Sequence, residues 1–183
     1  KSFGLPWEVC KLVDGPELGS PSADEVNLRI EAAPINPAEI LIMEGKYASK
    51  PPLPARLGIE GVGTMTYVGD GVQGFAVGDR VMSMGRANWA QEIQVPASTL
   101  IKVSTEADLL QIGMLKVNPA TAKFMLDHYV DLKPGDWVVQ NAGNSAVARY
   151  LIQLAKAKGV HSINIVRREG LEQELIEIGA DLV

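Results

Sequence analysis

The segment from Asp136 to Arg168 constrains the fold of this chain more than any other stretch. It opens with an apolar run, WVVQNA, continues as SAVARYLIQLAKAKG, and returns to a second apolar run, HSINIVRR. The middle part has helical spacing, and Gly159 is a typical helix stop. We therefore expect a buried strand, a helix closed by Gly159 and a second buried strand, which is the repeating unit of parallel sheets.

A further helix, LEQELIEIGA, follows this unit and is expected to end at Gly179. The sequence thus predicts an α/β fold in which the first part of a parallel sheet is present. A complete dinucleotide-binding fold has two βαβαβ halves, and about half of one is expected here. A strand over 163–166 would then form a sheet edge. We expect the 183-residue chain to be unstable, oligomeric or associated with a missing C-terminal segment.

The region before this unit has a different character. Prolines, glycines and short β-type runs recur from Lys1 to about Lys116. EVNLRIEAAPI alternates like a half-buried strand, PAEILIMEG predicts a short helix from Pro37 to Gly45, and WAQEIQVPASTLIKV predicts two strands broken at Pro96. These runs predict a small, partly open β-barrel. We therefore expect two domains, 1–116 and 117–183.

A helical segment is expected where the second domain begins. LLQIGMLKVNPATAKFMLDHYV has helical spacing, and either Asn118 or Thr121 suits its N-terminal cap.

Composition excludes several classes of function. The net charge is −5 and the basic residues are scattered, so no nucleic-acid footprint is expected. Cys10 is the only cysteine, which excludes an intramolecular disulfide and fits a reducing compartment. No apolar run approaches the roughly 20 residues of a membrane span. We expect a small-molecule partner, no nucleic acid and no membrane, and a cytoplasmic location with the mitochondrial matrix as an alternative.

The turn NAGNSAVA lies between the first strand and the helix, at the place where GxGxxG would mark a dinucleotide site. Gly143 can tighten the turn or let the backbone approach a phosphate. Asn144 and Ser145 suit the helix start, where free N–H groups and the helix dipole favour an anion. An ordinary helix cap explains the Asn-Ser pair equally well, so two interpretations stay open.

The end of the second strand favours NADPH. An acid placed about 20 residues after the turn accepts the ribose hydroxyl in NAD sites, whereas arginine accommodates the 2′-phosphate in NADP sites. Here the strand ends with Arg167 and Arg168. A planar guanidinium suits a phosphate dianion. The alternative is a solvated strand end that binds nothing.

Together with VNPATA and APINPAEILIMEGKYASKPPLPARLGIEGVG, these segments resemble the medium-chain dehydrogenase/reductase superfamily. Within it, the chain is most similar to the zinc-free enoyl thioester reductases, with quinone oxidoreductases as close relatives. The resemblance covers nearly the whole chain. It implies a GroES-like catalytic domain followed by the first part of a Rossmann domain. It also implies a homo-oligomer.

The resemblance also assigns residues. Zinc-dependent members carry Gly-His-Glu where this chain has Gly58-Ile59-Glu60, so no catalytic zinc is expected. Tyr47 matches the tyrosine that donates a proton in the enoyl reductases. The remaining matches imply cofactor contacts: Asn118 and Thr121 near the nicotinamide, and Asn144, Ser145, Ala146 and Val147 at the pyrophosphate.

The resemblance implies an NADPH-dependent reduction of an enoyl thioester. Two alternatives stay open: an NADPH quinone oxidoreductase, and a non-catalytic fragment without a complete cofactor site. Tyr47 could also be a surface residue that covers its loop, and Asn118 and Thr121 could be helix caps alone.

Overall fold

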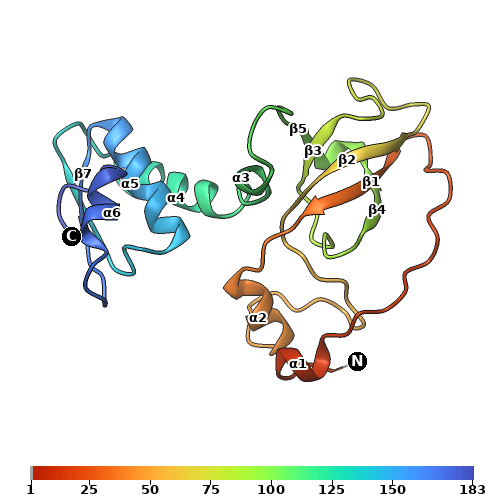
Figure 1. Ribbon diagram of the computed structural model, residues 1–183, viewed down its shortest axis with the longest axis horizontal. Coiled ribbons are helices and arrows are strands. Elements are labelled where there is room, and N and C mark those ends of the chain that lie inside the picture. The colour runs from red at the N-terminus through yellow and green to blue at the C-terminus, as the bar shows by residue number, and fades with distance from the viewer. Residues whose placement is uncertain (1) are drawn as a thin grey trace. The chain divides into compact units, whose positions relative to one another are not determined.

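The computed structural model describes residues 2–183. The chain divides into two compact units, Lys1–Met114 and Leu115–Val183. Both units are visible in Figure 1. The domain boundary expected after Lys116 stays a prediction, although the two units meet close to it.

The first unit contains a five-stranded antiparallel sheet with the strand order β4-β1-β2-β3-β5. Within residues 2–183 the sheet is open, because β4 and β5 are its two end strands. This agrees with the expected partly open barrel. The five strands are β1 (Glu25–Ala32), β2 (Gly61–Val68), β3 (Arg80–Ser83), β4 (Glu92–Pro96) and β5 (Leu100–Lys102).

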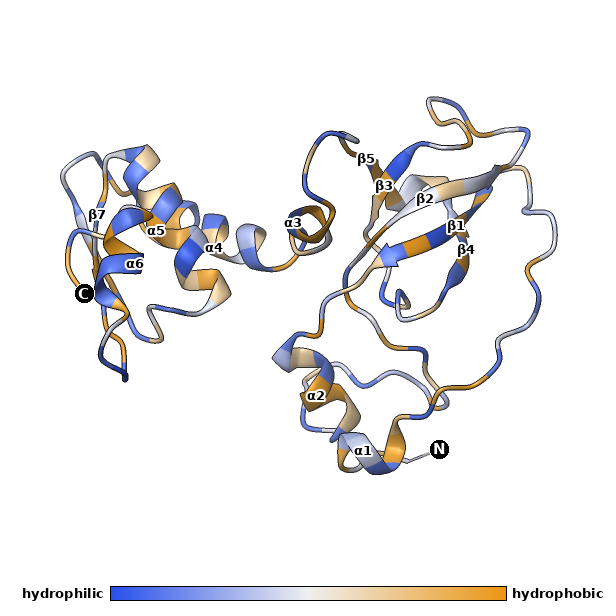
Figure 2. Cartoon of the chain, viewed as in Figure 1, coloured by the Kyte–Doolittle hydropathy of each residue, from blue (hydrophilic) through white to orange (hydrophobic). Residues whose placement is uncertain are grey.

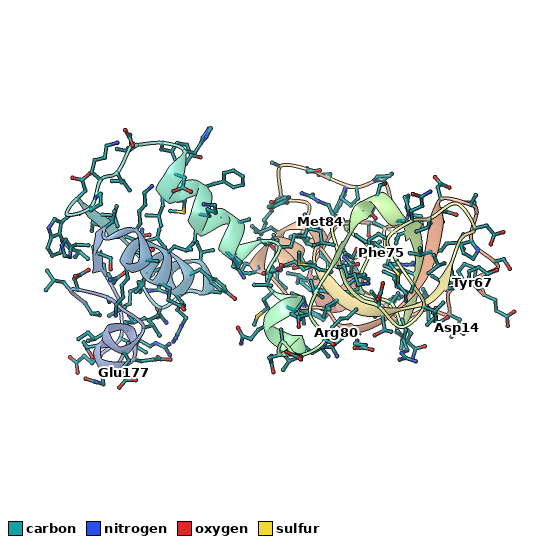
Figure 3. All side chains as sticks on the ribbon, turned by 90° about the horizontal axis from the view of Figure 1, so that it is seen from above. Asp14, Tyr67, Phe75, Arg80, Met84 and Glu177 are labelled. Carbon is teal, nitrogen blue, oxygen red and sulfur yellow. The ribbon has the colours of Figure 1, made fainter. Side chains whose placement is uncertain are left out.

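The core of the first unit follows from the alternation in β1. Val26 and Leu28 are fully buried and pack with Met65, Val81 and Ile93 from the neighbouring strands. Figure 2 shows the same alternation along β1 as bands of opposite hydropathy. In Figure 3 Phe75 lies among the side chains of this core, and Tyr67 lies at the outer edge of the unit.

A short helix and a break between strands lie where the prolines and glycines of this unit predict them. Helix α2 begins at Pro37 as expected, and Gly45 follows its end with a φ of 70° that favours glycine. A 3-10 turn separates β4 from β5 directly after Pro96, as expected for a broken strand pair. The helices are α1 (Pro6–Val9), α2 (Pro37–Met43), α3 (Leu109–Gly113) and the 3-10 turn η1 (Ala97–Thr99).

The second unit confirms the α/β prediction. Strands β6 and β7 are parallel, in register from Trp137 opposite His161 to Gln140 opposite Asn164, and α5 connects them. Helices α4 and α5 share a core with Ala122, Leu151 and Val160. The elements are α4 (Asn118–Asp127), β6 (Trp137–Gln140), α5 (Ala146–Lys158), β7 (His161–Asn164) and α6 (Glu172–Glu177).

Two expectations about local structure are wrong. Neither Asn118 nor Thr121 caps α4: the cap position is Val117, whose carbonyl accepts the first hydrogen bond of the helix, from the Thr121 N–H at 2.9 Å. The Thr121 hydroxyl instead donates to the Val117 carbonyl at 2.7 Å. The second predicted strand is also too long, since β7 ends at Asn164.

The expectation that the second strand forms an open sheet edge is also wrong. Ile163 forms a parallel bridge with Leu182, and the Leu182 N–H donates to the Ser162 carbonyl at 3.1 Å. Strand β7 therefore lies between β6 and the last residues of the chain. Among residues 2–183 the open edge belongs to β6, whose strand partner is β7.

Candidate functional site

The turn between β6 and α5 is the first part of the candidate site. The Ser145 N–H donates to the Ala142 carbonyl at 2.8 Å, and the Gly143 N–H donates to the Ile165 carbonyl at 3.0 Å. Ala142 has a φ of 50°, a left-handed conformation that is uncommon for a residue with a side chain. The surrounding hydrogen bonds hold this conformation in place.

The turn leads directly into a capped helix. Ser145 is the N-cap of α5, and its hydroxyl accepts a hydrogen bond from the Ala148 N–H at 3.2 Å. The expected cap is thereby confirmed for Ser145. The N–H groups at the start of an α-helix have no partner within the helix and carry the positive end of its dipole. Those of Ala146 and Val147 are suited to an anion.

A pocket of about 540 Å³ lies against this turn. It brings together Ser145 and Val147, two of the expected cofactor contacts. Asn144 is half-buried in the same turn and Ala146 begins the helix, but neither lines the pocket. The lining residues are Met125, Val139, Gln140, Asn141, Ala142, Ser145, Val147, Ala148 and Ile165.

The structure explains why the turn can form with a single glycine, Gly143. A Cβ atom at Gly143 would lie 3.0 Å from the Cβ atom of Asn164, so the backbone of the turn directly contacts β7. Ala148 takes the place where the fingerprint has a glycine for close packing of the helix on its strand. Its methyl group is small enough to be buried, with 2% of the residue exposed.

The two arginines expected at the ribose lie outside this pocket. Arg167 and Arg168 are exposed and follow β7, whereas Ile165 is the pocket residue closest to them in sequence. Their assignment to the 2′-phosphate stays a prediction.

Helix α4 contributes residues that the sequence did not single out. These residues are Phe124 and Met125. Together with Thr121, which the sequence did single out, and with His128 and Tyr129 just after the helix, they line a second pocket of about 350 Å³. Met125 belongs to both pockets, so α4 borders the space beside the turn. The sequence does contain a signal for Met125: it follows Thr121 by four residues, and residues four apart share a helix face. Asn118 is half-buried at the first position of α4.

Charged groups fasten α4 to α5. Lys123 and Lys158 donate to the Asp127 carboxylate at 2.6 Å and 2.9 Å. These hydrogen bonds lower the pKa of Asp127 to about 2. Because Lys158 ends α5, the ion pair holds together the two helices that border the pocket.

Tyr47 lies in the first unit, in the turn that follows α2. Its side chain is half-buried, and its N–H donates to the Leu41 carbonyl at 3.1 Å. The start of the same helix is fixed by Glu39, whose fully buried carboxylate accepts from the N–H groups of Asn36 at 2.6 Å and Ile59 at 2.9 Å. Because these hydrogen bonds are buried, they hold the start of α2 rigidly, and the turn with Tyr47 follows this helix.

Glu60 belongs to the same buried cluster. It is fully buried and accepts a hydrogen bond from the Asn36 side chain at 2.9 Å. Between residues 2 and 183, no group of three or more histidine, cysteine, aspartate or glutamate side chains is arranged to hold a metal ion.

Comparison with known proteins agrees with the resemblance found in the sequence. Residues 22–105 match the alcohol dehydrogenase GroES-like domain. The mitochondrial enoyl-[acyl-carrier-protein] reductase of Xenopus tropicalis is 37% identical over 100% of this chain and 54% of its own length. Along its whole length the chain is thus similar to proteins of the medium-chain dehydrogenase/reductase superfamily.

Two solved structures have a fold similar to that of this chain. The Escherichia coli quinone oxidoreductase complexed with NADPH matches 100% of the chain and 56% of its own, with a TM-score of 0.88 and 26% identity. The Candida tropicalis enoyl thioester reductase Etr1p, in complex with NADP and crotonyl-CoA, matches 89% of the chain and 52% of its own, with a TM-score of 0.82 and 31% identity. The chain spans about half the length of the curated relatives it matches.

Proposed function

We propose that this chain forms part of an NADPH-dependent, zinc-independent reductase of activated carbon–carbon double bonds, most similar to the 2-enoyl thioester reductases. The observation that carries the proposal is the turn from Asn141 to Ser145, which leads into a capped helix start beside a pocket of about 540 Å³. A similar protein also supports the proposal, because the Etr1p structure contains NADP and crotonyl-CoA.

The turn residues would hold the pyrophosphate of NADPH. The N–H groups of Asn144, Ala146 and Val147 suit phosphate oxygens, because they lie at the positive end of the α5 dipole. Arg167 and Arg168 would bind the 2′-phosphate, and Asn118 and Thr121 would contact the nicotinamide or the substrate. When bound, NADPH supplies a hydride to the β-carbon of the enoyl thioester.

Tyr47 would complete the reduction. Hydride addition at the β-carbon places negative charge on the thioester oxygen and the α-carbon. A phenol hydroxyl can hydrogen-bond that oxygen and donate the proton that the α-carbon needs. The buried carboxylate of Glu39 fixes the start of the helix that precedes Tyr47.

A quinone oxidoreductase is the second candidate. The Escherichia coli quinone oxidoreductase matches the whole chain with a TM-score of 0.88. The same cofactor turn serves either substrate, because substrate choice depends on the residues that surround the acceptor. A non-catalytic fragment is the third possibility, as the matched relatives are about twice as long.

Calorimetric titration with NADPH, with NADH as the control, tests the proposal first. We expect NADPH to bind more tightly, and equal affinities would remove the role of Arg167 and Arg168. Reduction of crotonyl-CoA is then compared with reduction of a quinone, using Tyr47→Phe as the variant. Loss of crotonyl-CoA reduction in this variant, with unchanged NADPH binding, supports the proton donor. Absence of NADPH binding by the unaltered chain would favour the fragment.

We also propose a mitochondrial matrix location and a dimeric protein. The matched enoyl-[acyl-carrier-protein] reductases are named mitochondrial, and one similar structure is a heterodimer of Etr1p and Etr2p. No helix among the described residues is long and apolar enough to cross a membrane. Light scattering after size exclusion tests the assembly, and a well-folded monomer contradicts it.

A further inference from the structure

A buried asparagine lies directly beneath the candidate nucleotide turn. Asn164 ends β7 and has 0% of its surface exposed. Asparagine is seldom buried to this extent unless its amide is hydrogen-bonded. Here the amide nitrogen donates to the Ser162 hydroxyl at 3.0 Å and to the Leu182 carbonyl at 3.1 Å, and the amide oxygen accepts from the Gln140 side chain at 2.6 Å.

The turn rests on this residue. A Cβ atom at Gly143 would lie 3.0 Å from the Cβ atom and 3.2 Å from the carbonyl carbon of Asn164, so the two backbones are in van der Waals contact. The next residue continues the connection: the Gly143 N–H donates to the Ile165 carbonyl, and the Ile165 N–H donates to the Gln140 carbonyl at 2.9 Å. The distance between the turn and the sheet is therefore set at Asn164.

The opposite side of Asn164 is fixed by the end of the chain. Its backbone N–H donates to the Leu182 carbonyl at 2.9 Å, so this one carbonyl accepts both a backbone and a side-chain hydrogen bond from the same residue. Asn164 thus joins β6, β7 and the segment that contains Leu182. A displacement of any of them reaches the turn through buried hydrogen bonds, which are stiffer than exposed ones.

We propose that Asn164 is a positioning residue for the nucleotide turn. It holds the N–H groups of Asn144, Ala146 and Val147 in the arrangement that a phosphate requires, without contacting the nucleotide. This inference rests on the proposed NADPH function. It differs from the role of Arg167 and Arg168, because the pyrophosphate is common to NADPH and NADH, whereas the 2′-phosphate is not.

The test is Asn164→Leu, which keeps the branched shape of the side chain and removes all three side-chain hydrogen bonds. We expect the dissociation constant for NADPH to rise about tenfold or more, since a small shift of several donors weakens each contact. Amide hydrogen exchange gives an independent readout: the Gly143 amide should exchange about tenfold faster while the amides within α5 stay protected.

Ser162→Ala is the matched control. It removes one partner of the same buried amide but does not touch the turn, so it should lower stability and leave NADPH affinity within about twofold of the original. If Asn164→Leu does not fold, Asn164→Ser keeps a donor toward Leu182 and should show the same changes to a smaller degree.

Three results would overturn the inference. One is an Asn164→Leu variant with unchanged NADPH affinity, and another is unchanged exchange at Gly143. The third is a loss of affinity that merely follows the loss of stability, to the same extent in Ser162→Ala. If the unaltered chain binds no NADPH, the proposed function fails instead, and exchange at Gly143 alone then decides whether Asn164 positions the turn.

Discussion

The two sheets of this protein differ in how much of their apolar surface is buried. In the first unit, β1 has strand partners on both sides, and Val26, Leu28 and Val81 have no exposed surface. In the second unit, one face of the parallel sheet packs on helices, but the other leaves Trp137 52% and Val139 65% exposed.

The difference has a physical basis. An antiparallel sheet can function with one face solvated, whereas parallel sheets are ordinarily covered on both faces. Four apolar or aromatic residues alternate along the uncovered face of β6 and the β7 region, namely Trp137, Val139, Ile163 and Ile165. The second unit is therefore the part whose stability should respond most to an additional covering partner.

The largest expected effect comes from removing core volume in the first unit. Leu28→Ala should destabilise that unit by about 2 to 5 kcal/mol, because the residue is fully buried in the central strand. Urea unfolding would be followed in two single-tryptophan variants, one that keeps Trp89 in the first unit and one that keeps Trp137 in the second. We expect only the Trp89 transition to shift.

Leu175→Ala is the converse variant, since Leu175 of α6 is fully buried in a cluster with Ile152 of α5. It should shift only the Trp137 transition. A single common transition in both variants would show that the units unfold together, and the contrast between them would not hold.

A smaller effect is expected in the turn of the second unit. Ala142→Gly should raise stability by less than about 1 kcal/mol, because relief of the left-handed strain exceeds the added freedom of the unfolded chain. The midpoint of urea unfolding at Trp137 measures the change. Ala157→Gly, at an exposed helical position of α5, should instead lower stability. Equal losses in both variants would disprove strain at Ala142.

The smallest effect concerns the ion pair between α4 and α5. Hydrogen bonds from Lys123 and Lys158 depress the pKa of Asp127 from 3.8 to about 2 in the folded state. A depressed pKa stabilises the fold above the unfolded value, and this contribution disappears as the pH falls from about 4 toward 2. Lys158→Met should raise the pKa of Asp127 measured by NMR. An unchanged titration would exclude Lys158 as a partner.

Local pattern predicted much of both units. The alternation in EVNLRIEAAPI, the proline at Pro37 and the break at Pro96 each mark an element that the structure contains. The cap at Ser145 was also predictable, because its hydroxyl acts on the next turn of its own helix. The cap of α4 was not, since Asn, Pro and Thr all favour a helix start and only backbone geometry selects Val117.

The sequence by itself determined the class of fold, the order of elements and the place of the turn before α5, because these follow from periodicity and from residues close together in the chain. Only the tertiary structure decided that Leu182 covers β7 and that Asn164 supports Gly143. Those contacts join segments about 20 residues apart, whose hydrogen bonds carry no periodic signal. For the same reason the position of Met125 was not predicted, since it borders the turn through the packing of α4 on α5.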